Sequence, residues 1–275
     1  MKHRIRKLLR SFGYDIRKVP HLSHARANRS KGHIIEMIGP SGIGKSTVYN
    51  SLFGEYKKDW YTRSQLRPVA EVNNEFIRLE DRFLNEIYST LLKDKVNNLF
   101  SRNYSLQKKY QLLKFMNDEV AVDIIANSQL LNKGLFSDEG LTHNFGEELI
   151  ALEYKLKNKE NACISNACIS KEGMESFFRF RSIISITAST EYIKGNLKKR
   201  SLKLEKEGRS NNQNDFYKII GEEHLDEHIQ RISQENKKLI QVAEKYGAEV
   251  LTIDVEKEKK KEIKKSVGDF IKKVL

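Results

Sequence analysis

A glycine-rich segment followed by lysine and serine is the clearest candidate for chemistry in this chain. Residues 39–46 read Gly-Pro-Ser-Gly-Ile-Gly-Lys-Ser and satisfy the pattern Gly-x-x-x-x-Gly-Lys-Ser/Thr without a mismatch. Glycines let backbone N–H groups turn inward around an anion, and the start of a following helix adds a favourable dipole. The lysine of this pattern reaches the β- and γ-phosphates of a nucleoside triphosphate, and the serine hydroxyl ligates Mg²⁺. With ATP and Mg²⁺ as the expected cofactors, the predicted binding residues are Gly39, Pro40, Ser41, Gly42, Ile43, Gly44, Lys45, Ser46 and Thr47.

The elements around this loop are predicted from the spacing of apolar residues. Residues 33–38 predict a strand that leads directly into the loop, and residues 45–53 predict the helix that follows it. Further strands are expected at 59–63, 134–138, 182–187 and 249–254. Helices are expected at about 72–100, 105–131, 145–156, 189–200, 225–243 and 257–274. This alternation predicts an α/β fold, a five-stranded mainly parallel sheet with helices on both faces.

The predicted organisation has two parts. Residues 1–31 are expected to form a basic N-terminal arm and connector, and residues 32–275 an α/β domain. Within that domain, the long helices at about 72–131 predict a helical insertion beside the sheet. The polar segment at about 201–215 shows no sustained apolar period and predicts a lid.

The net charge of +13 is concentrated at the two ends of the chain. Residues 1–31 carry ten basic side chains against one acid, and residues 255–275 carry eight against four. The rest is close to neutral, so a nucleic-acid enzyme with a basic working face is not expected. Residues 3–12 have the spacing of a short basic amphipathic helix. Residues 1–20 could therefore contact an anionic membrane or a protein partner, or pack on the core.

Localisation is predicted from what the sequence lacks. No apolar run approaches the roughly 20 residues needed to span a bilayer, and the first 20 residues are too charged for a secretory signal. Two cysteines, Cys163 and Cys168, lie in a duplicated Asn-Ala-Cys-Ile-Ser segment and give no disulfide framework or metal-ligand pattern. We expect a cytoplasmic protein, with peripheral contact at the inner membrane face as the alternative.

Other motifs narrow the class of nucleotide-binding protein. A GTPase needs Asn-Lys-x-Asp after a late strand, and an ABC-type ATPase needs a Leu-Ser-Gly-Gly-like signature; the sequence has neither where it is required. The phosphate loop, residues 138–140 (Asp-Glu-Gly), and residues 191–200, which end in Lys-Lys-Arg, resemble the thymidylate kinase and deoxynucleoside kinase branch of P-loop kinases. Residues 246–254 are similar to the last strand of that family. The resemblance implies a P-loop kinase fold with a mobile, arginine-bearing lid.

The sequence also departs from that family at two strand ends. Residues 62–65 (Thr-Arg-Ser-Gln) keep the arginine of the family's Arg-Glu-Pro turn but lack its acid and proline. The Asp-Arg pair after the third strand is replaced by Asp138 and Glu139. These differences leave the acceptor open, as nucleotide-like or carbohydrate-like.

Catalytic roles are assigned from position along the chain. Asp138 ends a strand expected beside the phosphate loop, so it is the candidate Mg²⁺ ligand or acceptor base, with Glu139 as the alternate. Arg200 and Arg209 are expected to bring positive charge to the transferring group when the lid closes. Arg63 and Arg67 could hold the acceptor, and His143 is expected to cap the next helix.

Two functions fit these residues. The first is ATP- and Mg²⁺-dependent phosphoryl transfer to a small-molecule acceptor by a kinase-type enzyme. The second is a nucleotide-dependent regulatory or membrane-associated ATPase module. A sulfotransferase would explain a phosphate loop but not the complete Gly-Lys-Ser ending.

Overall fold

The computed structural model of the chain describes residues 32–73, 82–127, 131–158, 163–164, 167–168, 170–209 and 215–275. The predictions made for the basic arm, residues 1–31, lie outside the described residues. The same holds for residues 74–81 of the helical insertion and residues 210–214 of the lid.

Five strands form one sheet in the order β2-β3-β1-β6-β7, and every neighbouring pair is parallel. β1 (Ile34–Ile38) lies in the middle. The other four are β2 (Trp60–Tyr61), β3 (Gly134–Ser137), β6 (Arg181–Thr187) and β7 (Glu249–Asp254). The predicted five-stranded sheet is confirmed. A separate antiparallel hairpin, β4 (Cys163–Ile164) with β5 (Ala167–Cys168), was not predicted and lies within the duplicated segment.

Helices follow most of the strands and form the lobe beside the sheet. Their bounds are α2 (Lys45–Tyr56), α3 (Arg63–Asn73), α4 (Arg82–Ser101), α5 (Leu106–Asn127), α6 (Leu141–Asn144), α7 (Gly146–Lys157), α8 (Lys171–Phe178), α9 (Thr190–Lys206), α10 (Phe216–Ile220), the 3₁₀ turn η1 (Glu222–His224), α11 (Leu225–Lys245) and α12 (Lys260–Val274).

Two of these helices differ from the sequence-based expectation. α3 begins at Arg63, nine residues before the expected start at 72, and it contains Pro68 in its interior, which ordinarily argues against a helix. α9 continues to Lys206, although a polar lid segment was expected from residue 201. The reason is that Ser201 is buried and its hydroxyl donates to Asp215 at 2.7 Å, so a polar side chain packs inward.

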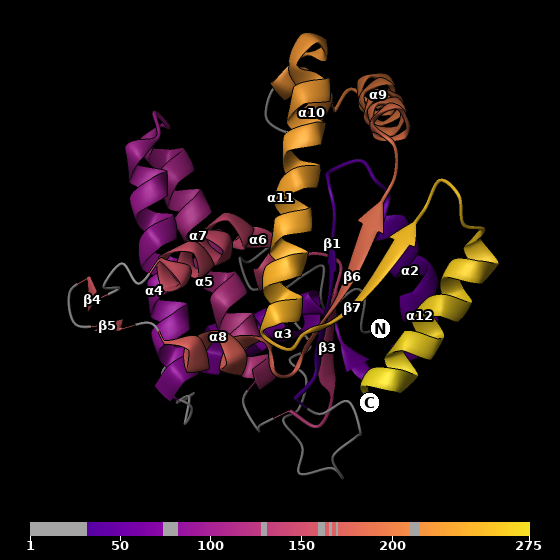
Figure 1. Cartoon of the computed structure of the whole chain (residues 1–275). Coiled ribbons are helices and arrows are strands. Elements are labelled where there is room, and N and C mark those ends of the chain that lie inside the picture. The colour runs from indigo at the N-terminus through magenta and orange to yellow at the C-terminus, as the bar shows by residue number, and fades with distance from the viewer. Residues whose placement is uncertain are drawn as a thin grey trace, which may run out of the picture.

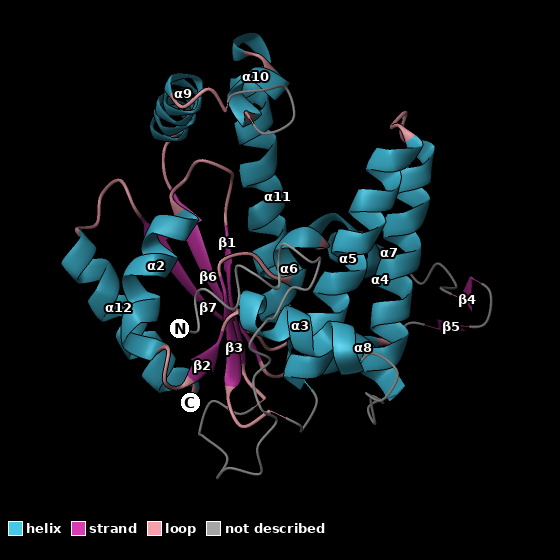
Figure 2. Cartoon of the chain, turned by 180° about the vertical axis from the view of Figure 1, so that it is seen from behind, coloured by secondary structure: helices cyan, strands magenta, loops and turns pink. Residues whose placement is uncertain are grey.

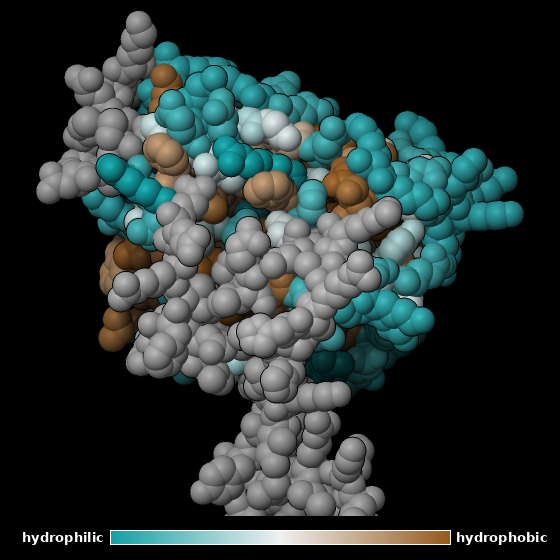
Figure 3. All heavy atoms as spheres, turned by 90° about the horizontal axis from the view of Figure 1, so that it is seen from below, coloured by the Kyte–Doolittle hydropathy of each residue, from teal (hydrophilic) through white to brown (hydrophobic). Residues whose placement is uncertain are grey.

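The sheet is covered on both faces, as Figures 1 and 2 show. Side chains of β1 alternate between the two cores: Ile35 and Met37 pack with α2, α9 and α12, while Ile38 packs with α4, α7, α8 and α11. Burial on both faces explains why β1 reads as a nearly continuous apolar run. The described part of the lower face is mostly hydrophilic, with hydrophobic groups between (Figure 3). Among the described helices, none is long and apolar enough to cross a bilayer.

Parallel strands place their carboxyl ends at one edge of the sheet. The phosphate loop after β1, residues 138–140 after β3, Ala188 after β6 and Val255 after β7 therefore lie along the same edge, at the top in Figure 1. α9 and α10 lie above this edge, and α4 and α5 stand beside it. The fold thus gathers the candidate residues from across the sequence.

Candidate active site

The phosphate loop adopts the backbone geometry that its glycines predict. Gly39, Gly42 and Gly44 have φ values of 149°, 82° and 103°, which residues with a Cβ rarely adopt. Gly39 is also closely packed, because a Cβ there would lie 2.8 Å from the carbonyl oxygen of Ile186. α2 begins at Lys45, so the amides of its first turn point into the loop. The loop is therefore shaped to receive an anion.

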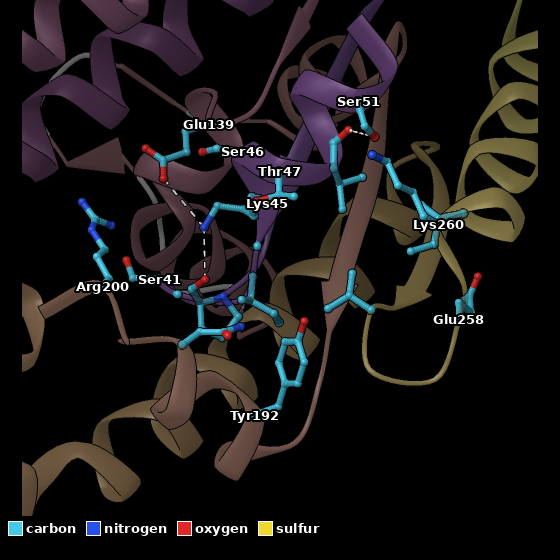
Figure 4. A pocket seen from close by; sticks show the side chains of 18 residues that line it. Ser41, Lys45, Ser46, Thr47, Ser51, Glu139, Tyr192, Arg200, Glu258 and Lys260 are labelled. Carbon is cyan, nitrogen blue, oxygen red and sulfur yellow. Dashed lines mark hydrogen bonds and ion pairs between the residues drawn. The ribbon is translucent and has the colours of Figure 1, made fainter. Parts of the chain in front are cut away.

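A cavity of about 570 Å³ opens over the loop. Residues 40–48 line one part of it, and Glu139 and Arg200 also contribute. Figure 4 shows Arg200 on the same side of the loop as Glu139, with Tyr192, Glu258 and Lys260 further round the cavity. The remaining wall is formed by Ser51, Asn196, Val255 and Ile263. The cavity has room for a nucleotide.

Lys45 lies across the loop in this structure. Its side chain is 5% exposed, and its Nζ donates to the carbonyl oxygens of Gly39 at 2.6 Å and Pro40 at 3.2 Å. The same Nζ lies 3.7 Å from Oε1 of Glu139. Burial lowers the pKa of Lys45, while Glu139 and Asp138 act in the opposite direction. A bound triphosphate would take over the role of these oxygens as partner of the ammonium group.

Ser46 and Asp138 form the candidate metal site. The Ser46 hydroxyl donates to Oδ2 of Asp138 at 3.2 Å, across 92 residues of sequence. A hydroxyl and a carboxylate are hard oxygen ligands of the kind that Mg²⁺ prefers. The residues present fit the ion. Sequence analysis predicted both as metal ligands, and the structure brings them together. The described residues hold no cluster of three His, Cys, Asp or Glu side chains that could bind a metal.

Glu139 links the phosphate loop to α3. Its side chain is 42% exposed and faces Lys45. Its backbone carbonyl accepts hydrogen bonds from the Arg63 guanidinium and, at 2.5 Å, from the Ser137 hydroxyl. Asp138 and Glu139 therefore point to neighbouring but different partners, one to Ser46 and one to Lys45.

A buried carboxylate, Glu119 of α5, holds the two arginines of α3 together. Arg63 Nε lies 3.1 Å and Arg67 Nη2 2.8 Å from Oε1 of Glu119. Both guanidinium groups also lie 5.7 Å from the ring centre of Phe115. Asn144 donates to the other oxygen of Glu119 at 3.4 Å. Burial raises the pKa of Glu119, and Arg63 and Arg67 oppose this shift. This cluster adjoins Glu139 and is the candidate acceptor side of the site.

A second buried network fixes the segment after β3 from behind. Glu36, in the middle of β1, accepts hydrogen bonds from the backbone N–H groups of Leu141 at 3.1 Å and Thr142 at 2.9 Å. The guanidinium of Arg181 pairs with Glu36 and binds both carboxylate oxygens of Asp123, at 3.1 and 2.7 Å. All three charged side chains are buried. Sequence analysis missed this network, although a charge inside an apolar strand such as Glu36 is a signal of a buried partner.

His143 does not cap the next helix, so that prediction is wrong. The N-cap residue of α7 is Phe145, and no side-chain hydrogen bond caps the start of this helix. The Nδ1 atom of His143 is instead buried without a hydrogen-bond partner among the described residues. Burial, together with the positive charges of Lys45 and Arg63, lowers the pKa of His143 to about 3. The imidazole is therefore neutral at ordinary pH.

The two lid arginines lie in different places. Arg200 lines the cavity. Arg209 is 70% exposed, pairs with Glu207 at 3.2 Å and is not among the residues of the cavity wall. The structure thus brings Arg200 to the phosphate loop and leaves Arg209 outside it.

No protein-family model and no curated protein matches this sequence. Two solved structures of deoxyadenosine kinase from M. mycoides are similar to it. The structure with bound dCTP has 16% identity and a TM-score of 0.38, and covers 87% of this chain and 99% of its own. The structure with dCMP and a flexible dCDP as products has 15% identity and a TM-score of 0.34, and covers 88% and 98%. At these values the likeness concerns the fold.

The phosphate loop joins the middle strand of a five-stranded parallel sheet to the helix that follows it. The chain has a parallel α/β fold built around a phosphate loop. The candidate site combines the loop, the Ser46–Asp138 pair and the cavity wall supplied by α9 and the segment after β7.

Proposed function

We propose that this protein transfers the γ-phosphoryl group of ATP, with Mg²⁺, to a small-molecule acceptor. The observation that supports the proposal is the Ser46–Asp138 hydrogen bond beside Lys45, because a hydroxyl and a carboxylate that would bind the metal lie next to a cation that would bind phosphate. The nucleoside of ATP would occupy the rest of the cavity, against Tyr192, Val255 and Ile263.

Phosphoryl transfer requires alignment and charge neutralisation more than covalent help. Loop amides and Lys45 hold the β- and γ-phosphates, while Arg200 approaches from α9 to neutralise charge on the transferring group. Ser46 and Asp138 would hold Mg²⁺, which would supply further positive charge to the triphosphate. Together these residues would favour transfer of the phosphoryl group to the acceptor over transfer to water only when the acceptor is bound.

The acceptor is assigned to the side of the loop where Glu139 faces Lys45. Because Asp138 is engaged with Ser46, Glu139 is the carboxylate better placed to accept the proton of an acceptor hydroxyl. The arginines bound to Glu119 adjoin this position and would orient a hydroxylated or acidic acceptor, either nucleotide-like or carbohydrate-like.

The proposal is tested by ADP release with a metabolite panel of nucleosides, nucleotides, sugars and lipid-linked glycans. A kinase should show low basal turnover that rises with one acceptor class and stops when EDTA removes the metal. Lys45→Ala should abolish Mg-ATP binding in calorimetry. Slow hydrolysis that no acceptor accelerates would instead support the regulatory ATPase, and unchanged ATP binding by Lys45→Ala would overturn the site.

A further inference from the structure

The end of the α4–α5 helical hairpin carries apolar side chains in water. Phe100 is 53% exposed, Tyr104 39%, Leu106 79% and Tyr110 69%. Leu106, Tyr110 and the half-buried Leu113 recur at the i, i+4, i+7 spacing of one helix face. Scattered exposed apolar residues are normal, but a continuous stripe at the free end of a hairpin needs a partner. Figures 1 and 2 show this end projecting beyond the rest of the lobe.

The same hairpin end is basic. The sequence has no acidic residue from Val96 to Asn117, and this stretch contains Arg102, Lys108, Lys109 and Lys114. Lys109 joins the two helices, because its Nζ donates to the carbonyl oxygen of Phe100 at 3.1 Å and lies 5.4 Å from the centre of that ring. The other three cations are exposed. Apolar and cationic groups therefore share one surface, which we call the hairpin tip (residues 100–114).

We propose that the hairpin tip docks onto an anionic lipid surface. An apolar stripe flanked by lysines suits the boundary between headgroups and acyl chains, where long basic side chains reach back to the phosphates. A nucleic-acid site combines cations with aromatic rings on which the bases stack. The most exposed apolar residue here is Leu106, an aliphatic side chain that offers no ring for stacking. An acidic protein surface would satisfy the lysines but leave Leu106 and Tyr110 without an apolar partner.

The position of the hairpin tip adds a consequence for the site. The tip, α9 and α10 all lie at the end of the molecule toward which the strands run (Figure 1). Docking through the tip therefore turns the phosphate-loop edge of the sheet toward the membrane. This inference stands on residues 100–114 and is independent of the proposed reaction and of the basic arm.

A fluorophore placed on the tip tests the docking. In the full chain with Cys163→Ser and Cys168→Ser, Leu106→Cys carries an environment-sensitive label, and Tyr154→Cys, at a 62% exposed position on α7, carries the control label. Vesicles of phosphatidylcholine with phosphatidylglycerol should shift the emission of the Leu106→Cys label to the blue, and pure phosphatidylcholine should not. The control label should stay unchanged with both.

Cation removal supplies the second measurement. Each lysine near an anionic surface is worth about a fivefold change in partitioning, so Lys108→Gln with Lys114→Gln should raise the half-maximal vesicle concentration about thirtyfold. Cosedimentation without a shift at residue 106 would mean that another segment, such as the arm, makes the contact, and would overturn the proposal. Absence of binding to the anionic vesicles would also overturn the proposal. The same holds for a larger emission shift of the Leu106→Cys label with RNA than with anionic vesicles.

Discussion

Substitution of Gly140 tests how closely the segment after β3 packs against Glu36. This glycine lies between Glu139 and the start of α6, with extended backbone that any residue adopts. A Cβ there would nevertheless lie 2.6 Å from Cγ of Glu36 and closer still to its carboxyl carbon. Glu36 cannot move away cheaply, since its carboxylate accepts two backbone N–H groups and pairs with Arg181. Gly140→Ala should therefore displace a buried, fully bonded acid.

The expected loss follows from those contacts. Breaking a buried ion pair by displacing one partner costs about 3 to 5 kcal/mol, because a desolvated charge loses its compensation. In a chain of this size, that loss lowers the midpoint of thermal unfolding by about 10 °C. The free energy of unfolding is measured by urea denaturation, and the midpoint by calorimetry.

Gly54→Ala is the matched control. Gly54 lies within α2, where a Cβ would meet no atom within 4 Å. The same substitution in an unobstructed helix position should stabilise the protein by up to about 1 kcal/mol. Equal stability of the two variants would refute the close packing of Glu36 against Gly140.

Two further predictions concern charge at the site. Burial with Lys45 and Arg63 nearby lowers the pKa of His143 to about 3, while the unfolded chain binds this proton near pH 6.5. The stabilisation that comes from neutral His143 is thus fully present above pH 6.5 and is lost as the pH falls toward 3, with a loss of about 2 kcal/mol at pH 5. In urea titrations between pH 7 and 5, the free energy of unfolding should fall less steeply for His143→Gln than for the unchanged protein. Parallel curves for the two proteins would contradict this prediction. Arg200→Ala should slow acceptor-dependent ADP release at least about a hundredfold, with little change in ATP binding. Arg209→Ala should alter neither ADP release nor ATP binding in the same assays. Equal losses in the two variants would place both arginines in the site.

The phosphate loop and the sheet could be predicted because their signals are local. The loop motif fixes its own backbone through three glycines, and each parallel strand reads as an apolar run. Adjacency of Ser46 and Asp138 followed from the rule that parallel strands end at one edge. These parts need no knowledge of how distant side chains pack.

The charged networks could not be predicted because their partners are distant in sequence. Glu36, Asp123 and Arg181 come from three elements separated by at least 58 positions, and only packing selects them as partners. From the sequence, Glu119 in α5 likewise looks like an ordinary solvated acid, because its partners Arg63 and Arg67 belong to α3. The helix α3 was itself not predicted, since it contains Pro68. The predicted capping role of His143 failed because His143 lies inside the short helix α6, and Phe145 is the N-cap residue of the next helix.

The central place of β1 has a consequence for how the chain folds. Its two neighbours in the sheet, β3 and β6, lie about 100 and about 150 residues further along the sequence, so the pairings that build the middle of the sheet are long-range and slow to form. A nascent chain can complete the β3 side of the phosphate loop only once residues 134–137 have been synthesised, and the β6 side only once residues 181–187 have followed. Nucleotide affinity should therefore appear late and in one cooperative step during refolding, after the helices have already formed.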